Sequence, residues 1–200
     1  MSEAEGEKVA LGESGPPRGT QVPPRSRAAV RQMSTALRAY LGEVNPYVDV
    51  QRLIEHKLME HFGVIFAVQE PFVLGEDEGR TYPDRLVLEL RSDVYDALAA
   101  GDPRARFTAM HEVAHLFLHQ GIPLRRASRS AAQRNLPHRH YEDSEWQADA
   151  FAAEFLMPLE HVLRLPRLTA AAASVRFKVS LRAAMVRMNV LRNEGLLRMK

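Results

Sequence analysis

Two histidines separated by three residues give the chain its strongest chemical signal. His111 and His115 flank Glu112 in the motif HExxH, here His-Glu-Val-Ala-His. On a helix, positions i and i+4 lie on one face about one turn apart, so both imidazoles can reach one metal ion. Glu112 lies about 100° around the helix, where it can accept a proton from water without being a ligand. The spacing predicts a metal site with a general base beside it.

The composition limits which metal and which third ligand fit. Catalytic zinc takes nitrogen and oxygen ligands and keeps one position open, so zinc suits this site. The chain has no cysteine, so the third ligand must be a histidine or a carboxylate. His119 lies two turns beyond His111, about 12 Å along a straight helix, which is too far to share one ion. We therefore interpret His119 as a cation that the dipole favours at the helix C-terminus.

A pair of acids at the same i, i+4 spacing follows on the next predicted helix. Glu145 can complete the ligand set, and Asp149 can accept a hydrogen bond from a ligating imidazole and fix its tautomer. This ExxxD spacing after HExxH is typical of thermolysin-like zinc peptidases with a glutamate ligand. Glu142 lies on the same face and is the rival ligand, although the helix dipole alone explains an acid so near a helix start.

Longer stretches around these residues resemble one family. Residues 107–119 resemble the RFTxxHExxHxxLH helix of ImmA/IrrE metallopeptidases, and residues 145–158 resemble the family's second signature, ExxA(N/D)xFAAxLLMP. Residues 173–183 resemble its helix-turn-helix-like C-terminal segment. The resemblance covers roughly residues 45–195. Ala114 and Phe155 stand where the family commonly has Gly and Leu, and neither is a proposed ligand.

The resemblance implies a zincin-like fold and a function. It maps His111, His115 and Glu145 onto the ligands of a Zn²⁺ cofactor and Glu112 onto the catalytic glutamate. The implied activity is that of a zinc endopeptidase that cleaves a helix-turn-helix repressor and so derepresses mobile-element or stress-response genes. Two other interpretations stay open. The chain can be a regulatory or DNA-binding module, or a toxin component, whose metal site is not catalytic.

Hydrophobic periodicity and turn residues indicate the elements that must position these side chains. We expect a mostly helical α+β domain with a small sheet of about three strands. The predicted helices cover residues 28–41, 49–63, 94–100, 103–120 and 142–157. The predicted strands cover 64–68, 72–74 and 86–90, with 72–74 as the middle element and a turn at 75–79.

Composition and charge divide the chain of 200 residues into three parts. Residues 1–27 are rich in Pro and Gly and have no aromatic residue, which predicts disorder. Residues 28–160 form the expected peptidase domain. Residues 161–200 hold nine basic residues and one acid, a balance of +8, whereas residues 1–160 hold 18 basic and 24 acidic residues, a balance of −6. No apolar run approaches the roughly 18 residues of a membrane span, and the acidic N-terminus is unlike a signal peptide, so we expect a cytoplasmic protein.

Two further segments carry weaker signals. The arginine-rich loop over residues 123–141 joins the two predicted metal helices, and one of His138, His140 or Tyr141 can stabilise an oxyanion there. The pattern of residues 169–192 predicts a helix-turn-helix. We expect Arg182, Arg187 and Arg192 to lie away from the apolar face of its second helix. This segment can contact DNA or dock a protein, and its basic charge does not decide between the two.

Overall fold

The computed structural model describes residues 18–122 and 138–197. These residues form a mostly helical α+β structure with one three-stranded sheet, which confirms the predicted fold class. In chain order the elements are α1 (Arg27–Tyr40), α2 (Val50–Arg52), the π turn η1 (Leu53–Lys57), α3 (Leu58–Phe62), β1 (Ile65–Gln69), α4 (Pro71–Leu74), β2 (Gly79–Tyr82), the 3-10 turn η2 (Pro83–Arg85), β3 (Val87–Arg91), α5 (Ser92–Ala99), α6 (Pro103–Leu118), the 3-10 turn η3 (His140–Glu142), α8 (Ser144–Leu156), α9 (Leu159–Val162), α10 (Ala170–Phe177) and α11 (Leu181–Asn193).

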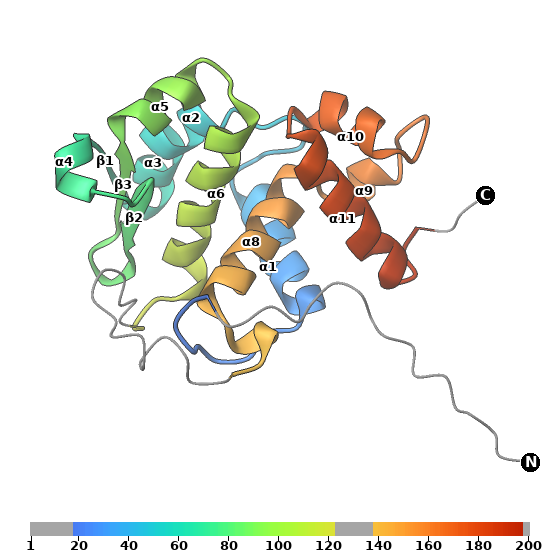
Figure 1. Cartoon of the computed structure of the whole chain (residues 1–200), viewed down its shortest axis with the longest axis horizontal. Helices are drawn as coiled ribbons and strands as arrows, with labels where there is room; N and C mark the ends of the chain where they lie inside the picture. The colour runs from blue at the N-terminus through green and yellow to red at the C-terminus, as the bar shows by residue number, and fades with distance from the viewer. Residues whose placement is uncertain (1–17, 123–137, 198–200) are drawn as a thin grey trace, which may run out of the picture.

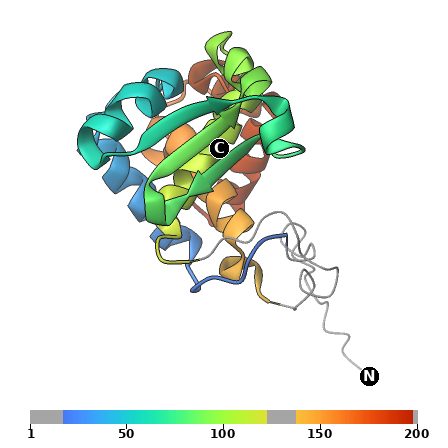
Figure 2. The same ribbon diagram turned by 90° about the vertical axis from the view of Figure 1, so that its left-hand side faces the viewer.

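The helix α6 lies at the centre of the molecule. The sheet packs on one side of it and α8 on the other, and α1 covers the far side of α8 (Figure 1). Viewed from the side of the sheet, the strands lie in front of the helices (Figure 2). Leu88 and Leu90 of β3 are fully buried, as are Met110 and Val113 of α6. Burial of these apolar side chains fixes α6 between its neighbours.

The sheet differs from the prediction in the identity of its third strand. Its order is β1-β3-β2, with β1 parallel and β2 antiparallel to β3. Residues 72–74, predicted as the middle strand, belong to the short helix α4, because Pro71 occupies its first turn and Phe72 is 86% exposed rather than packed in a sheet. The third strand is β2 at the edge, which begins at Gly79, the last residue of the predicted turn. Its sequence, Gly-Arg-Thr-Tyr, lacks the apolar run on which the prediction relied.

The N-terminal segment is ordered earlier than predicted. Disorder was expected up to residue 27, but residues 18–26 lie beside the start of α8. Gln21 forms an isolated antiparallel bridge with Asp143, the backbone N–H of Val22 donates to the carbonyl of Glu142 at 2.8 Å, and Val22 is buried. Backbone pairing to another element orders this segment despite its composition. Residues 1–17, and residues 123–137 of the predicted arginine-rich loop, lie outside the described residues.

The C-terminal helices form the expected turn. Lys178 adopts a left-handed conformation with φ 50° after α10, and the Ser180 side chain caps α11 by accepting from the N–H of Ala183. One expectation for α11 is wrong. Arg187 does not face solvent but is 2% exposed, and it forms a bidentate ion pair with Glu154 of α8, with a 2.6 Å distance between Nη1 and Oε1. No helix in the described part of the chain is both long and apolar enough to cross a bilayer.

We expect the buried ion pair to be the main polar link between α8 and α11. Replacing Arg187 with Met leaves the carboxylate of Glu154 in the interior with Arg31 as its remaining partner at 3.1 Å. The free energy of unfolding should fall by about 3 kcal/mol. Urea denaturation of the full chain measures this. The exposed Arg192 on the same helix is the control, because Arg192→Met should cost less than about 0.5 kcal/mol. Equal unfolding midpoints for the two variants would contradict the assignment.

Candidate metal centre and active site

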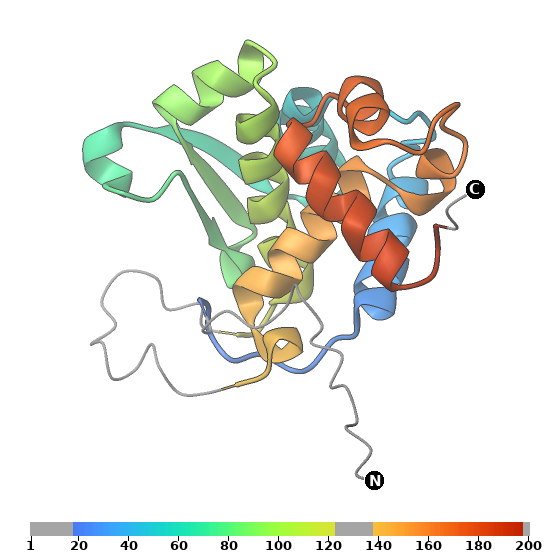
Figure 3. The same cartoon turned by 45° about the vertical axis from the view of Figure 1, so that its right-hand side comes forward.

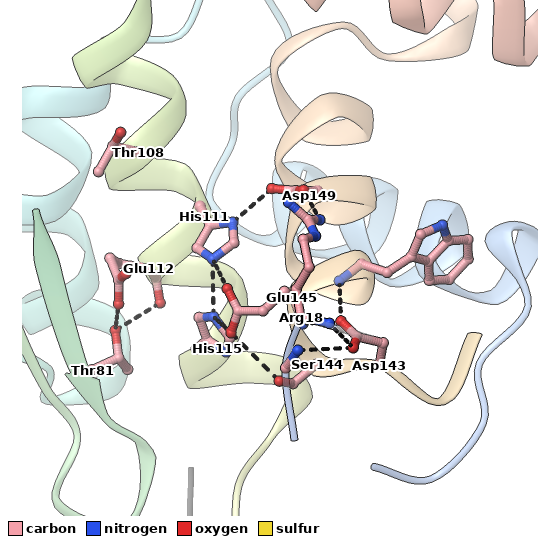
Figure 4. A network of polar contacts seen from close by, with 12 residues as sticks. Arg18, Thr81, Thr108, His111, Glu112, His115, Asp143, Ser144, Glu145 and Asp149 are labelled. Atoms are coloured by element: carbon pink, nitrogen blue, oxygen red, sulfur yellow. Dashed lines mark hydrogen bonds and ion pairs between the residues drawn. The ribbon is translucent and has the colours of Figure 1, made fainter. Parts of the chain in front are cut away.

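The local sequence sets the start and direction of α6. Asp102 caps the helix, because its carboxylate accepts the backbone N–H groups of Arg104 and Ala105 at 2.9 and 2.8 Å, and Pro103 fills the first helical position. From this start the helix turns His111 and His115 toward α8 and turns Glu112 toward β2 (Figure 4). The two parts of the HExxH motif therefore face different elements.

Three predicted ligands converge between α6 and α8. The Nε2 atoms of His111 and His115 lie 3.1 Å apart, and the carboxylate of Glu145 lies 3.1 Å from the first and 3.6 Å from the second. Their ligand atoms all lie within 4.8 Å of one another, so this group can hold a metal ion. Glu142, the rival ligand, is outside this group; its carboxylate accepts the backbone N–H of Arg139 at 3.1 Å.

Asp149 lies on the outer side of this group. Its carboxylate is 2.9 Å from His111 Nδ1 and 2.6 Å from the guanidinium of Arg18. Burial disfavours a charge on His111, but its hydrogen bonds to Asp149 and Glu145 outweigh this and raise the pKa of His111 to about 10. The carboxylates thus stabilise a positive charge where the ligand atoms meet. A divalent metal ion can take the place of that proton, so the residues fit a metal site.

His119 has a role that the sequence analysis did not assign. It is fully buried rather than a cation at an exposed helix end, and burial lowers its pKa to about 4. The helix end lies in the interior, beside α8. The Nε2 of His119 is 3.3 Å from the side-chain oxygen of Gln147, and its Nδ1 is 2.9 Å from Nδ1 of His115.

The orientation of Gln147 determines the direction of these hydrogen bonds. Its amide nitrogen donates to the carbonyls of Pro23 and Tyr141 at 2.9 and 2.8 Å, so its oxygen faces His119 as an acceptor. A neutral His119 then donates from Nε2 and accepts at Nδ1. His115 in turn donates from Nδ1, which leaves the lone pair on its Nε2 for a metal ion.

Glu112 is held on the side of the sheet. The hydroxyl of Thr81 in β2 is 2.7 Å from the carboxylate of Glu112 and 3.0 Å from its backbone carbonyl, and Glu112 is only 5% exposed. A Cβ atom on Gly79 would lie 2.7 Å from Cγ of Glu112, so only glycine permits this close approach of the strand. Neither Thr81 nor Gly79 was singled out from the sequence, because the contact crosses between elements.

The three candidate oxyanion residues lie before α8, in or next to the 3-10 turn η3, and do not line the cavity. His138 is 3.0 Å from the carboxylate of Asp143, and the ring of His140 packs against Trp146. The hydroxyl of Tyr141 forms a hydrogen bond with Arg139. None of the three is among the described residues that line the cavity at the ligand group. Their predicted role gains no support from this geometry.

The N-terminal segment forms part of the site. The Asp143 carboxylate caps α8 through Glu145 and Trp146 and also accepts the backbone N–H groups of Arg18 and Gly19, at 2.9 and 2.8 Å. Burial opposes ionisation of Asp143, but these backbone hydrogen bonds lower its pKa. A Cβ atom on Gly19 would clash with Ser144 and Glu145, so the segment passes directly over the third ligand. We refer to residues 18–26 as the N-terminal strap.

An open cavity of about 960 Å³ leads to the ligand group. His111, Glu112 and Glu145 line its floor, and three consecutive acids, residues 76–78, line one wall. Its volume is at the upper end of the range for small-molecule sites. A water molecule and a segment of polypeptide can both reach Glu112 and the ligand group from this side.

A match to a protein-family model agrees with this assignment. The Peptidase M78 family model, described as an IrrE N-terminal-like domain, matches residues 95–189, a range that includes α6, α8 and all three residues of the ligand group. No curated protein matches the chain. A solved structure, a Mycobacterium tuberculosis transcriptional regulator, is similar to this chain, with 14% sequence identity and a TM-score of 0.46. The match covers 82% of this chain and 52% of the regulator, so the chain spans about half the length of the regulator. The family match, which covers just under half of the chain, and the two signatures that it spans support membership of the ImmA/IrrE family.

Proposed function

We propose that the chain is a zinc-dependent endopeptidase. The observation that carries this proposal is the convergence of His111, His115 and Glu145 beside Glu112, at an open cavity lined by His111, Glu112 and Glu145. Two imidazoles and one carboxylate, with a side open to solvent, form the ligand set of catalytic rather than structural zinc. The chain has no cysteine, so it has none of the thiolate ligands of cysteine-rich structural zinc sites.

The protein residues have separate tasks in this reaction. His111, His115 and Glu145 would hold the zinc ion, which would act as a Lewis acid and lower the pKa of water to about 7. Glu112 accepts the proton of the attacking water and delivers it to the nitrogen of the leaving amine. Thr81 fixes the position of the Glu112 carboxylate. Asp149 and His119 orient the imidazoles of His111 and His115, respectively, through hydrogen bonds to their Nδ1 atoms.

The substrate that we propose is a helix-turn-helix transcriptional repressor in the cytoplasm. The resemblance of both signatures to the ImmA/IrrE family supports this choice, since cleavage of such a repressor is the activity described for the family. The size of the cavity also suits a polypeptide. A repressor encoded beside the gene for this chain is the first substrate to test.

The role of Glu112 separates a peptidase from a protein whose metal site is not catalytic. Glu112→Gln removes the proton acceptor and keeps the shape, so cleavage of the repressor should slow by about 10²- to 10⁴-fold while zinc stays bound. Gel analysis of cleavage and measurement of zinc by mass spectrometry test both points. Glu142→Gln is the matched control and should cleave like the native chain. Cleavage that persists in Glu112→Gln would exclude the proposed reaction.

Thr81 should affect turnover without affecting the metal. Thr81→Val removes the hydroxyl that holds the buried Glu112 carboxylate, and a hydrogen bond to a charged group contributes about 1.5–3 kcal/mol. We expect kcat to fall about tenfold or more, with unchanged zinc affinity and KM. Thr81→Ser restores the hydroxyl and should restore most of the rate. A loss that Ser does not restore would indicate a packing defect rather than a role in positioning.

His119 should tune zinc affinity. His119→Phe keeps the bulk but removes the acceptor for His115 Nδ1, and loss of such an outer partner typically weakens metal binding by about 10- to 100-fold. His119→Gln offers an oxygen acceptor and should recover part of the affinity. Competition with a chromophoric chelator measures the dissociation constants. Equal affinities of the native chain and His119→Phe would refute the proposed hydrogen-bond chain.

A further inference from the structure

A second cavity, of about 760 Å³, lies between α8 and α11. The two helices lie side by side in Figures 1 and 3. Trp146, Ala150 and Ala153 line it from α8 at i, i+4 and i+7, and Ala183, Val186 and Val190 line it from α11 at i, i+3 and i+7. Each helix therefore lines the cavity with the residues of a single face. The alanines are too small to fill the space between the faces, which leaves an apolar groove. We call it the α8–α11 groove.

Arginines surround this apolar floor. Arg18, Arg27, Arg104 and Arg182 all line the groove, and among the described residues that line it Asp149 is the only carboxylate. The charge of Asp149 is matched by His111 and Arg18. The Arg104 side chain is 78% exposed and pairs with Glu78 at the surface, an interaction of low energy. Arg182 is exposed and forms no ion pair within the described part of the chain. Arg27 pairs with Glu194 at 3.7 Å and packs over the ring of Trp146. The excess positive charge of the rim therefore comes mainly from Arg182 and from the weakly paired Arg104.

The groove is continuous with the cavity at the ligand group. Arg18, Arg104, Phe107, Thr108 and Arg182 line both of them. Asp149 also lines both, and it contacts His111 directly. A polypeptide that lies in the groove can therefore continue into the cavity beside Glu112 without leaving the surface.

We propose that the α8–α11 groove docks a segment of the polypeptide substrate that combines apolar side chains with carboxylates. This inference rests on the proposed peptidase function and names the chemistry that the site selects. The apolar floor takes the apolar side chains, and the arginine rim pairs with the acids. Its α11 wall runs from Ser180 to Val190, about 15 Å, which matches about ten residues of helix or four to five of extended chain. A nucleic acid can use the arginines, but it gains little from a floor of Ala and Val.

The position of Trp146 provides a direct test, because it is the only tryptophan of the chain and lines the groove. The probe is a synthetic peptide of about twelve residues that contains Leu, Ala and Glu, and its control has Lys in place of every Glu. Titration into the full chain with Glu112→Gln avoids cleavage. We expect the acidic peptide to change the fluorescence of Trp146 and to bind at least about tenfold more tightly than the basic one, with an affinity that falls as salt rises.

Two substitutions separate the charged and apolar parts of the groove. Arg182→Glu should weaken binding of the acidic peptide by about five- to tenfold through reversal of the charge. Ala183→Leu should weaken it by filling the floor. Arg192→Glu is the matched control, since Arg192 is exposed on the same helix but does not line the groove, and it should bind like the parent. Equal binding by all three variants, or equal binding of both peptides, would overturn the proposal.

If DNA or another part of the chain occupied the α8–α11 groove, the fluorescence of Trp146 would respond differently. A DNA duplex that changes Trp146 fluorescence at low salt more strongly than the acidic peptide would overturn the choice of a polypeptide. Deletion of residues 1–17 that shifts Trp146 fluorescence before any peptide is added would indicate that the chain's own N-terminus fills the groove, and this would also overturn the proposal. Binding is measured without turnover. A peptidase that fails in cleavage assays therefore leaves this result intact, and failure of the peptide to bind leaves cleavage to be judged separately.

Discussion

The packing of α6 against α8 and the sheet forces polar side chains into the interior, and each of them requires a partner there. His111 pairs with Asp149, His115 with His119, and Glu112 with Thr81. Burial of any of these groups without a hydrogen bond would cost several kcal/mol. These hydrogen bonds therefore orient the ligand atoms toward one another before any metal binds. A proton on His111 meets the electrostatic demand of the two nearby carboxylates, and a metal ion meets the same demand with a larger charge.

The parts of the site that lie within one helix could be predicted from the sequence. The spacing of His111 and His115, and that of Glu145 and Asp149, follows from helical periodicity, so their common faces needed no knowledge of the fold. Contacts between elements could not be predicted in this way. His119 was assigned a charge because the dipole favours a cation at a helix C-terminus, and only the packing of α8 shows that it is buried. The sheet illustrates the same limit, since β2 owes its place to pairing with β3 and not to an apolar sequence.

The arginines in and around the C-terminal helices have two different roles, one structural and one at the surface. Arg187 is directed inward, and Arg106 of α6 donates to the backbone carbonyls of Val48 and Lys178, at 3.0 and 3.2 Å. These buried arginines join α10 and α11 to the rest of the molecule, and they contribute little to the surface. Arg182 is exposed and faces both cavities. A count of basic residues over 161–200 cannot separate the buried Arg187 from the exposed Arg182, although only exposed arginines can attract a partner at long range.

Most of the acids that line the two connected cavities lie in one of them, and this has a consequence for any polypeptide that spans both. Residues 76–78 place three acids in the cavity near Glu112, and none of them lines the α8–α11 groove. Arg18, Arg104 and Arg182 line both cavities and so lie where the two join. A segment with carboxylates at one end and basic groups at the other has one favourable orientation, because reversal brings like charges together at both ends. Complementarity of this kind adds more to orientation and to the rate of encounter than to affinity. In the proposed peptidase, its effect would be to fix which peptide bond reaches Glu112.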